Sequence, residues 1–539
     1  MAIEYRKNKN TTLFQHFENT ALLNVYDVQN YIPIYERFFE LNATNWQNVT
    51  FSHELTLSTV VEKKGDENNY RALVVDEKEQ VKEVPVFFKY SPLLDPNKYI
   101  TGAYVLGKDD KLPQWGNETQ THNKLTDVNN AAYTDSFFYF LSNRLKQTHV
   151  FLHGLEFYGS YLGYKKDFKY NLEDDDTNFI FNDPFFKKHH GELFKTNVEI
   201  PGKLDKLTFG EECNIEVDTL DEVDLPPPLV PAGSGKAESE VVECNISEEK
   251  MSLKSKTSSI SSNSSNSSDE SETEGEGEDP NEEFGSSDES SMFDGDEPIV
   301  TIAKYPVQII AIESCKQTLD SLLNTIKTNE MTSCLLQVIM TLVAYQKAYQ
   351  FTHNDLHTNN IMYVETDVAF LYYFVDDVAY QVPTFGKIFK IIDFGRSVYT
   401  FQGKRFVSDS FSAQGDAATQ YNTEPYFDAS KPRLEPNYSF DLCRLACSMI
   451  DMLPETPEYE DLNHLINDWC LDNKGRNVVY KKNGEERYPG FKLYKMIART
   501  VHDHIPLTQL RRAMFQQYII KKKKLKGVDF LDMNSITMQ

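Results

Sequence analysis

The stretch His353-Asn-Asp-Leu-His-Thr-Asn-Asn-Ile-Met362 decides the fold, together with Phe389-Lys-Ile-Ile-Asp-Phe-Gly395 further along the chain. Both stretches follow apolar, regular segments. In the first, Asp355 stands five residues before Asn360, and in the second Asp393 ends an apolar strand. A lone Asp or Asn in a loop is usually a turn residue. Together, however, these two carboxylates and the amide oxygen can orient a hydroxyl and hold Mg²⁺ against a triphosphate.

These stretches resemble the catalytic loop and the metal-binding Asp-Phe-Gly of the eukaryotic-type protein kinase superfamily. Downstream, Asp441-Leu-Cys-Arg-Leu-Ala446 resembles the start of the central helix, whose Asp braces the catalytic loop. Three segments are similar to a divergent branch of protein kinases encoded by large DNA viruses: HNDLHTNNIM, VPTFGKIFKIIDFGRS and FFKYSPLLDP. The resemblance implies an α+β, two-lobed fold, with a small β-rich N-lobe and a larger, mainly helical C-lobe. ATP and Mg²⁺ would bind between the lobes.

The resemblance also implies the role of each site residue. Asp355 would orient the accepting hydroxyl and take its proton, while Asn360 and Asp393 would hold Mg²⁺. Lys89, in Pro85-Val-Phe-Phe-Lys-Tyr90, would fix the α- and β-phosphates. The other assignments are Asp135 as the partner that orients Lys89, Glu313 to Cys315 as the backbone that meets adenine, His357 near the transferred phosphate, and His353 as a structural core histidine. The implied reaction transfers the γ-phosphate of ATP to Ser or Thr hydroxyls of a protein substrate.

The lysine that positions ATP has two candidates. Ile302-Ala-Lys304 imitates the family motif, but only 51 residues separate Lys304 from Asp355, too few for the elements that must lie between. We therefore reject Lys304 in favour of Lys89, which precedes the helix containing Asp135. Asp135 replaces the Glu of the family pattern, so a shorter side chain has to reach the lysine.

Two other departures affect phosphate binding and regulation. No glycine-rich loop precedes Lys89, because Gly65 stands alone in an expected hairpin and the pair Gly159 and Gly163 comes too late. Asn354 stands where the family usually has Arg, the cation that answers phosphorylation of the following segment. We therefore expect activity that does not require phosphorylation between residues 397 and 438.

Two competing interpretations remain open. His357 makes the loop similar also to the HxDLHxxN loop of aminoglycoside and choline kinases, and no Ala-Pro-Glu follows Gly395. These features favour a small-molecule kinase. The missing glycine loop and Asp135 favour a pseudokinase scaffold, against which the joint presence of Asp355, Asn360 and Asp393 argues.

Charge is distributed unevenly along the 539 residues. The chain has 82 Asp and Glu against 55 Lys and Arg, a net charge of −27, which argues against a nucleic-acid partner. Residues 211–298 hold 26 acidic residues and four lysines, net −22. This Ser-rich, acidic tract has the composition of a disordered insertion and of a regulatory phosphorylation target, and a basic partner for it stays open. The Lys521-Lys-Lys-Lys-Leu-Lys526 cluster is read first as an exposed, solvated helix end, with a nuclear signal or a phosphate-binding patch as alternatives.

Periodicity and composition give the expected organisation. Strands are expected over 55–61, 71–75, 84–90, 155–164 and 300–314, helices over 131–145 and 332–349, a β-hairpin between 361 and 392, and mostly helices thereafter. The predicted divisions are an N-terminal extension (1–30), the N-lobe (31–170), the acidic, largely disordered insertion (171–298), the last strand with the hinge (299–314) and the C-lobe (315–539).

Cysteine usage and hydropathy predict the compartment. Seven cysteines without a CxxC pair indicate neither a disulfide framework nor a zinc ribbon, which fits a reducing compartment. No apolar run is long enough to suggest a signal peptide or a membrane partner. We therefore expect a cytoplasmic protein, in the host cytoplasm or the virion if it is viral.

Overall fold

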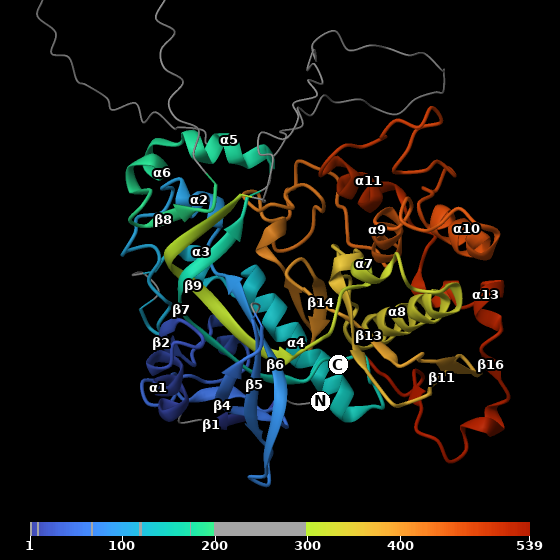
Figure 1. The fold of residues 1–539 in the computed structure, drawn as a ribbon, viewed down its shortest axis with the longest axis horizontal. Coiled ribbons are helices and arrows are strands. Elements are labelled where there is room, and N and C mark those ends of the chain that lie inside the picture. Colours follow the sequence, from blue (N-terminus) through green and yellow to red (C-terminus); the bar gives the residue numbers. More distant parts are fainter. Residues whose placement is uncertain (1–2, 8–9, 66–67, 118–120, 173, 199–297) are drawn as a thin grey trace, which may run out of the picture.

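The computed structural model describes residues 3–7, 10–65, 68–117, 121–172, 174–198 and 298–539. Within these ranges the chain forms a mixed α/β structure built on a curled β-sheet. Figure 1 shows this sheet on one side and most of the helices of the second half of the chain on the other, with helix α4 between them. In the described part, no helix is both long enough and apolar enough to span a membrane.

A seven-stranded sheet forms the first half of the structure. Six strands follow one another in the order β2-β7-β9-β6-β5-β4, and β8 pairs separately with β9. Every strand pairing in the described part of this sheet is antiparallel. Their bounds are β2 Val25–Gln29, β4 Thr56–Lys63, β5 Asn69–Val75, β6 Val81–Pro92, β7 Phe157–Asn171, β8 Phe194–Thr196 and β9 Ile299–Glu313. The strands expected from sequence are confirmed, with shifted ends: β4 and β7 begin slightly later than expected, and β6 and β7 extend further.

Helix α4 (Ala131–Thr148) packs against this sheet and carries one of the predicted site residues. Its first turn is capped by Asn130, whose side chain accepts a hydrogen bond from the N–H of Ala132. Such a cap satisfies one of the N–H groups that a helix start leaves unpaired. Nearly all of its side chains are buried, including Phe137 and Phe138. The helix predicted over 131–145 is therefore confirmed.

The sequence predicts that residues 1–30 form a separate N-terminal extension. In the structure, the described residues of this range pack against the first half of the chain instead. Strand β1 (Tyr5–Lys7) pairs with β3 (Val49–Phe51), and β2 lies at one edge of the main sheet. Helix α1 (Thr11–Asn19) buries Phe17, whose ring centroid lies 6.2 Å from that of Phe88 on β6. The pattern of buried Leu13 and Phe17 at helical spacing explains this docking.

The predicted insertion over 171–298 begins too early. Helices α5 (Asp174–Asn182) and α6 (Pro184–His189) and strand β8 lie within it. The buried rings of Phe186 and Phe194 stack 5.7 Å apart, so these residues contribute a small core beside β9. The prediction of disorder is wrong for this part. Residues 199–297 lie outside the described residues.

The second half contains helices and three small sheets. The helices are α7 Leu319–Leu322, α8 Thr328–Tyr349, α9 Phe440–Cys447, α10 Glu460–Trp469, α11 Lys492–Thr500, α12 Pro506–Gln509 and α13 Ala513–Gln516; shorter helices α2 Pro96–Ile100 and α3 Asn123–Thr126 belong to the first half. Helix α8 is buried over almost its whole length and forms the centre of this part. The predicted helix over 332–349 is confirmed.

The prediction of mostly helices after residue 349 is incomplete. Strands β10 (Ile361–Glu365) and β13 (Lys387–Ile391) pair, as do β14 (Val398–Phe401) and β15 (Lys404–Val407). The predicted hairpin before Asp393 is confirmed as β11 (Phe370–Val375) and β12 (Val378–Pro383). Short strands β16 (Ile519–Ile520) and β17 (Leu531–Asp532) extend it to a four-stranded sheet, and such two-residue strands carry no sequence periodicity.

Candidate functional site

Lys89 lies between two carboxylates. Its Nζ atom is 2.7 Å from Asp135 Oδ2 and 2.9 Å from Asp393 Oδ1. Asp135 comes from the beginning of α4 and its side chain is only 2 % exposed, whereas the side chain of Asp393 is 50 % exposed. A carboxylate buried as deeply as Asp135 needs a paired cation. The predicted ion pair between Lys89 and Asp135 is therefore present, and the shorter Asp side chain does reach the lysine.

These three groups set each other's charge state. Burial alone would lower the pKa of Lys89, but Asp135 and Asp393 raise it well above its ordinary value. Burial alone would raise the pKa of Asp393, but Lys89 lowers it to about 2. Burial raises the pKa of Asp135, and Lys89 opposes this shift. At neutral pH Lys89 is thus protonated and Asp393 is ionised.

The backbone at Asp393 is held in an unusual conformation. Its φ is +63°, a left-handed value that costs a non-glycine residue about 1–2 kcal/mol. The N–H of Asp393 donates to the Tyr139 hydroxyl at 2.9 Å, and the N–H of Phe394 donates to Asp135 Oδ1 at 2.7 Å. The Phe394 ring packs 4.6 Å from that of Phe138 on α4. Helix α4 therefore fixes both Lys89 and the direction of the Asp393 side chain.

Both carboxylate oxygens of Asp355 are engaged. The Tyr494 hydroxyl, from α11, donates to Oδ1 at 2.8 Å. Arg396, directly after Gly395, donates to Oδ2 at 3.3 Å and also pairs with Asp416 at 2.6 Å. Sequence reasoning gave Arg396 no role although the segment VPTFGKIFKIIDFGRS includes it. It missed Asp416 and Tyr494 because no quoted motif extends to these two residues. A hydroxyl that approaches Asp355 would share its carboxylate with Tyr494.

Asp441 at the start of α9 braces the backbone before Asp355, as the resemblance implies. Its two oxygens each accept one backbone N–H at 2.9 Å, from His353 and from Asn354. Burial raises the pKa of Asp441 to about 7, and these two N–H groups oppose the shift. The predicted brace is present. His353 is fully buried with Nε2 2.9 Å from the Ile392 carbonyl oxygen, and burial lowers its pKa, which agrees with a neutral core histidine.

Asn360 and Asp393 stand at the same end of a strand pair. Asn360 precedes β10 and Asp393 follows β13, and these strands pair antiparallel with Ile361 opposite Ile391. The Asn360 Nδ2 donates to the Asp355 carbonyl oxygen at 2.9 Å and lies 3.1 Å from His357 Nε2. The amide nitrogen is thus occupied, which leaves Oδ1 as the ligand atom. Burial lowers the pKa of His357 although Asp355 opposes this, so the ring is neutral at pH 7.

The donor set fits Mg²⁺ bound together with phosphate. In the described ranges, no three His, Cys, Asp or Glu side chains lie close enough to hold a metal ion. Mg²⁺ in phosphate-transfer sites takes only one or two protein carboxylates and completes its shell with water and phosphate oxygens. The half-exposed, ionised Asp393 and the oxygen of Asn360 meet this smaller requirement.

The predicted adenine-binding backbone is only partly available. The N–H of Glu313, at the end of β9, donates to the Glu156 carbonyl oxygen at 2.9 Å. The Glu313 side chain lies 3.5 Å from the buried Lys390, which lowers the pKa of Glu313 against the effect of burial. Burial raises the pKa of the Cys315 thiol to about 12. Of the predicted stretch, the backbone of Ser314 and Cys315 is the part that remains for a ligand.

The rejected lysine lies elsewhere. Lys304 Nζ is 3.6 Å from Asp110 Oδ2 and 3.9 Å from the centroid of the Tyr164 ring. It occupies β9 opposite Lys166, nine residues before Glu313. Gly65 lies in the turn between β4 and β5 with φ +71°, while the other two glycines weighed for a phosphate loop lie on β7. The rejection of Lys304 agrees with this placement.

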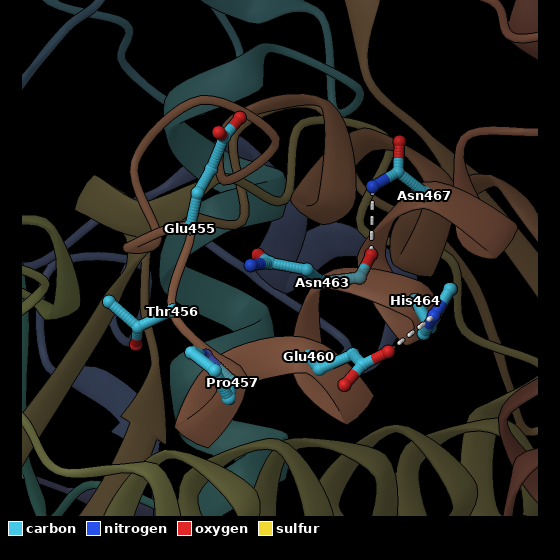
Figure 2. A pocket seen from close by; sticks show the side chains of 7 residues that line it. All are labelled: Glu455, Thr456, Pro457, Glu460, Asn463, His464 and Asn467. Atoms are coloured by element: carbon cyan, nitrogen blue, oxygen red, sulfur yellow. Dashed lines mark hydrogen bonds and ion pairs between the residues drawn. The ribbon is translucent and has the colours of Figure 1, made fainter.

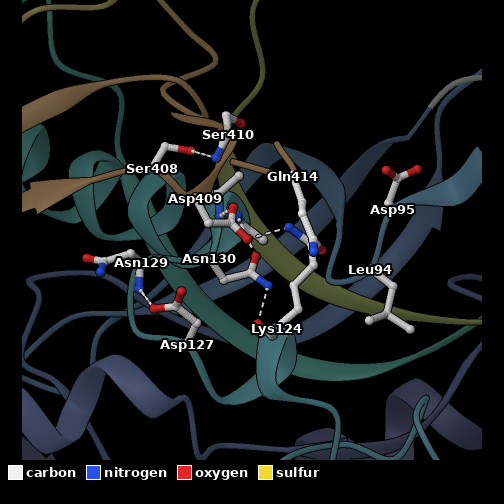
Figure 3. A network of polar contacts seen from close by, with 12 residues as sticks. Leu94, Asp95, Lys124, Asp127, Asn129, Asn130, Ser408, Asp409, Ser410 and Gln414 are labelled. Carbon is white, nitrogen blue, oxygen red and sulfur yellow. Dashed lines mark hydrogen bonds and ion pairs between the residues drawn. The ribbon is translucent and has the colours of Figure 1, made fainter. Parts of the chain in front are cut away.

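A polar network ties the start of α4 to the segment after Asp393 (Figure 3). Asp409, in a 3₁₀ turn (Asp409–Phe411), accepts a hydrogen bond from the N–H of Ala131 at 2.9 Å and forms an ion pair with Lys124. Its own N–H donates to the Asn129 carbonyl oxygen at 2.8 Å. A negative charge at a helix N-terminus is favourable because of the helix dipole. Sequence reasoning missed Asp409.

Two surface pockets of the described structure lie away from these residues. The pocket in Figure 2 has a volume of about 370 Å³ and is lined by Glu455, Thr456, Pro457, Glu460, Asn463, His464 and Asn467. A second, of about 510 Å³, lies between β14 and the region of Tyr438. Neither is lined by a predicted site residue.

Comparison of the sequence with protein-family models and with curated proteins returned no match.

Proposed function

We propose that the protein is an ATP- and Mg²⁺-dependent protein kinase that transfers the γ-phosphate of ATP to Ser or Thr hydroxyls of protein substrates. The observation that carries the proposal is the position of Lys89 between Asp135 and Asp393, at 2.7 and 2.9 Å. A buried acid, a lysine and a half-exposed acid in this order suit a lysine that is held ready for phosphate oxygens. In this proposal the seven-stranded sheet with α4 is the smaller lobe and residues from 315 onward form the larger lobe.

Each residue then has a defined task. Lys89 binds the α- and β-phosphates, and Asp135 keeps its ammonium in place. Asn360 and Asp393 hold Mg²⁺, which neutralises charge on the phosphates when it is bound. Asp355 orients the acceptor hydroxyl and takes its proton as the new O–P bond forms and the bond to ADP breaks. Positioning and electrostatics of this kind are the main contributions that such an enzyme makes.

Asp441 and helix α4 hold these residues in place. Asp441 holds the two residues before Asp355 through two hydrogen bonds of 2.9 Å. Because α4 contacts both Lys89 and Phe394, a change in its position would move the lysine and Asp393 together. This arrangement argues for a working phosphate site rather than a scaffold, because a scaffold has no need of an aligned, charged set.

A small-molecule kinase is the second candidate, and His357 favours it. His357 lies 3.1 Å from Asn360, beside the proposed metal ligands, where it resembles the HxDLHxxN loop of aminoglycoside and choline kinases. The acceptor decides between the two candidates. Labelled ATP with a mixed Ser/Thr peptide library and, in parallel, a panel of amino alcohols and aminoglycosides would show which class receives phosphate.

The direct test uses the purified chain, Mg²⁺ and ATP labelled at the γ-phosphate. We expect Asp393→Ala to lose transfer by at least about 100-fold, because the ionised carboxylate that would hold Mg²⁺ is removed. Asp428→Ala, an exposed Asp in a loop of the same segment, is the matched control and should keep the activity of the parent. Equal incorporation by the parent and by Asp393→Ala would refute the proposal.

A further inference from the structure

The segment that contacts Asp355 through Tyr494 is basic although the chain as a whole is acidic. Residues 474–499 contain eight Lys and Arg against two Glu, a net charge of +6, while the whole chain carries −27. This basic segment includes Tyr494, whose hydroxyl donates to Asp355 Oδ1 at 2.8 Å. The segment therefore lies next to the place where an acceptor hydroxyl would meet Asp355.

Helix α11 presents its cations on one face. Lys492, Lys495 and Arg499 follow one another at spacings of three and four residues, which places them on one side of a helix. Tyr494 and the buried Ile497 lie on other sides. Lys492 and Arg499 are exposed. Within the described residues none of these three cations forms an ion pair, unlike Arg476 and Lys481 of the same segment.

A further cation contacts the Tyr494 ring. The guanidinium of Arg444, on α9, is 4.9 Å from the centroid of the Tyr494 ring. In the part of the chain that the structure describes, its Nε atom is buried and has no hydrogen-bond partner. A buried donor without a partner costs about 1–3 kcal/mol. Arg396, in contrast, is balanced by Asp355 and Asp416 at 3.3 and 2.6 Å.

From these observations we infer that the acceptor is an acidic polypeptide segment, whose Asp or Glu residues lie against Arg444 and the cationic face of α11 while its Ser or Thr meets Asp355. The inference rests on the proposed function and names its substrate class. A helix is about 10 Å across. An extended chain advances about 3.3 Å per residue, so about three or four residues span this width. The acidic residues of the acceptor should therefore stand about three or four positions from the accepting hydroxyl.

The test uses the full chain and two synthetic peptides. One copies residues 264–276 of this chain, Ser-Ser-Asn-Ser-Ser-Asp-Glu-Ser-Glu-Thr-Glu-Gly-Glu, and the other has Lys at every Asp and Glu position. With labelled ATP and Mg²⁺, we expect kcat/KM to be at least about 10-fold higher for the acidic peptide at low salt, and the ratio to shrink as salt screens the charges.

Reversing the charge of the three cations on α11 tests whether they bind the acidic peptide. The variant Lys492→Glu/Lys495→Glu/Arg499→Glu should raise KM for the acidic peptide about 10-fold and leave KM for ATP unchanged. Lys522→Glu/Lys523→Glu/Lys524→Glu, in a 3₁₀ turn (Lys522–Leu525) beside the hairpin of β11 and β12, is the matched control and should change neither value. Thermal unfolding confirms that both variants are folded.

The outcomes separate the two proposals. Equal kcat/KM for both peptides, or an equal effect of both charge reversals, would overturn the acidic acceptor and leave the kinase proposal standing. Absence of transfer to either peptide, to proteins and to water would refute the kinase proposal and this inference with it.

Discussion

At the scale of single residues, the central feature of the candidate site is the pairing of Lys89 with two carboxylates. Its ammonium is shared by a buried acid on α4 and by the half-exposed Asp393. Removal of the ammonium would leave Asp135 buried without its counter-charge, which is costly in a protein interior. The same change would let the side chain of Asp393 repel Asp135.

The first prediction compares two lysines of the same sheet. Lys89→Met should lower kcat/KM for phosphate transfer by at least about 100-fold, because the phosphates lose their cation and Asp135 loses its partner. Lys304→Met should change it less than about twofold, because the described contacts of the Lys304 side chain are with Asp110 and Tyr164, neither of which is a predicted site residue. Initial rates with labelled ATP measure both. A comparable loss in both variants would show that the wrong lysine was chosen.

Sequence alone predicts the contacts that lie within motifs and misses those that join distant loops. The pairing of Lys89 with Asp135 follows from the order of a strand and a helix. Tyr494 and Asp355 are 139 residues apart, and Ala131 and Asp409 are 278 apart, with no periodicity to relate them. Such partners are set by how loops cross in three dimensions, which local propensity does not encode.

At the scale of secondary-structure elements, Asp409 anchors the helix that positions Lys89. Its carboxylate receives the N–H of Ala131 and pairs with Lys124. The anchor belongs to the segment after Asp393, so it joins the two sides of the site without a phosphate group. The sequence-based expectation that activity does not require phosphorylation there stays a prediction.

The second prediction concerns this anchor. Asp409→Asn keeps the shape but removes the charge, and it should lower kcat by about threefold to tenfold and Tm by about 2 °C, because helix-cap and dipole contributions amount to about 1 kcal/mol. Asp428→Asn is the control from the same segment and should change neither. Rates and thermal unfolding of the two variants check this. An unaltered kcat in Asp409→Asn would remove Asp409 from the description of the site.

The third prediction concerns His153, which joins the two halves of the structure. It is buried, with Nδ1 2.8 Å from the Phe389 carbonyl oxygen on β13 and Nε2 2.8 Å from the Tyr373 hydroxyl on β11. Burial lowers its pKa from 6.5 to about 4. A depressed histidine pKa stabilises the fold fully above pH 6.5, and this contribution is lost as the pH falls from 6.5 through 4.

The expected effect follows from the size of this shift. Between pH 7 and 4, His153 should account for about 3 kcal/mol of lost free energy of unfolding. His153→Gln cannot be protonated, so its Tm should fall less over this range than that of the parent. His464→Gln is the control, since His464 is 77 % exposed. Identical pH profiles for the parent and His153→Gln would contradict the prediction.

The boundary of the predicted insertion shows how composition can miss short secondary-structure elements. The sequence-based division groups residues 174–198 with the acidic tract that follows, although they contain five Phe residues. Of these, Phe181, Phe186 and Phe194 are buried in α5, α6 and β8. Helix α8, by contrast, contains a mainly apolar run from Cys334 to Tyr345 and was predictable.

At the scale of the whole molecule, the net charge of −27 is unevenly distributed along the chain. Residues 211–298 hold −22 of it, so the rest of the chain is nearly balanced at −5, and residues 474–499, which include Tyr494, carry +6. The chain on either side of the acidic tract belongs to one sheet, because β8 and β9 are paired. The N–H of Ile299 donates to Asn197 Oδ1 at 2.6 Å, so the two ends of the intervening segment are adjacent.

The last prediction follows from this adjacency. Because residues 197 and 299 are in contact, replacement of 203–294 by a linker of about six Gly and Ser residues can close the chain without strain on β8 or β9. We expect this deletion variant to keep Tm within about 2 °C of the parent and basal ATP turnover within about twofold, because each of Lys89, Asp355 and Asp393 keeps its contacts. A second variant, in which the 13 residues 264–276 are replaced by Gly and Ser at full length, controls for the linker. Loss of turnover in a deletion variant that unfolds at the temperature of the parent would show that the acidic tract takes part in catalysis itself.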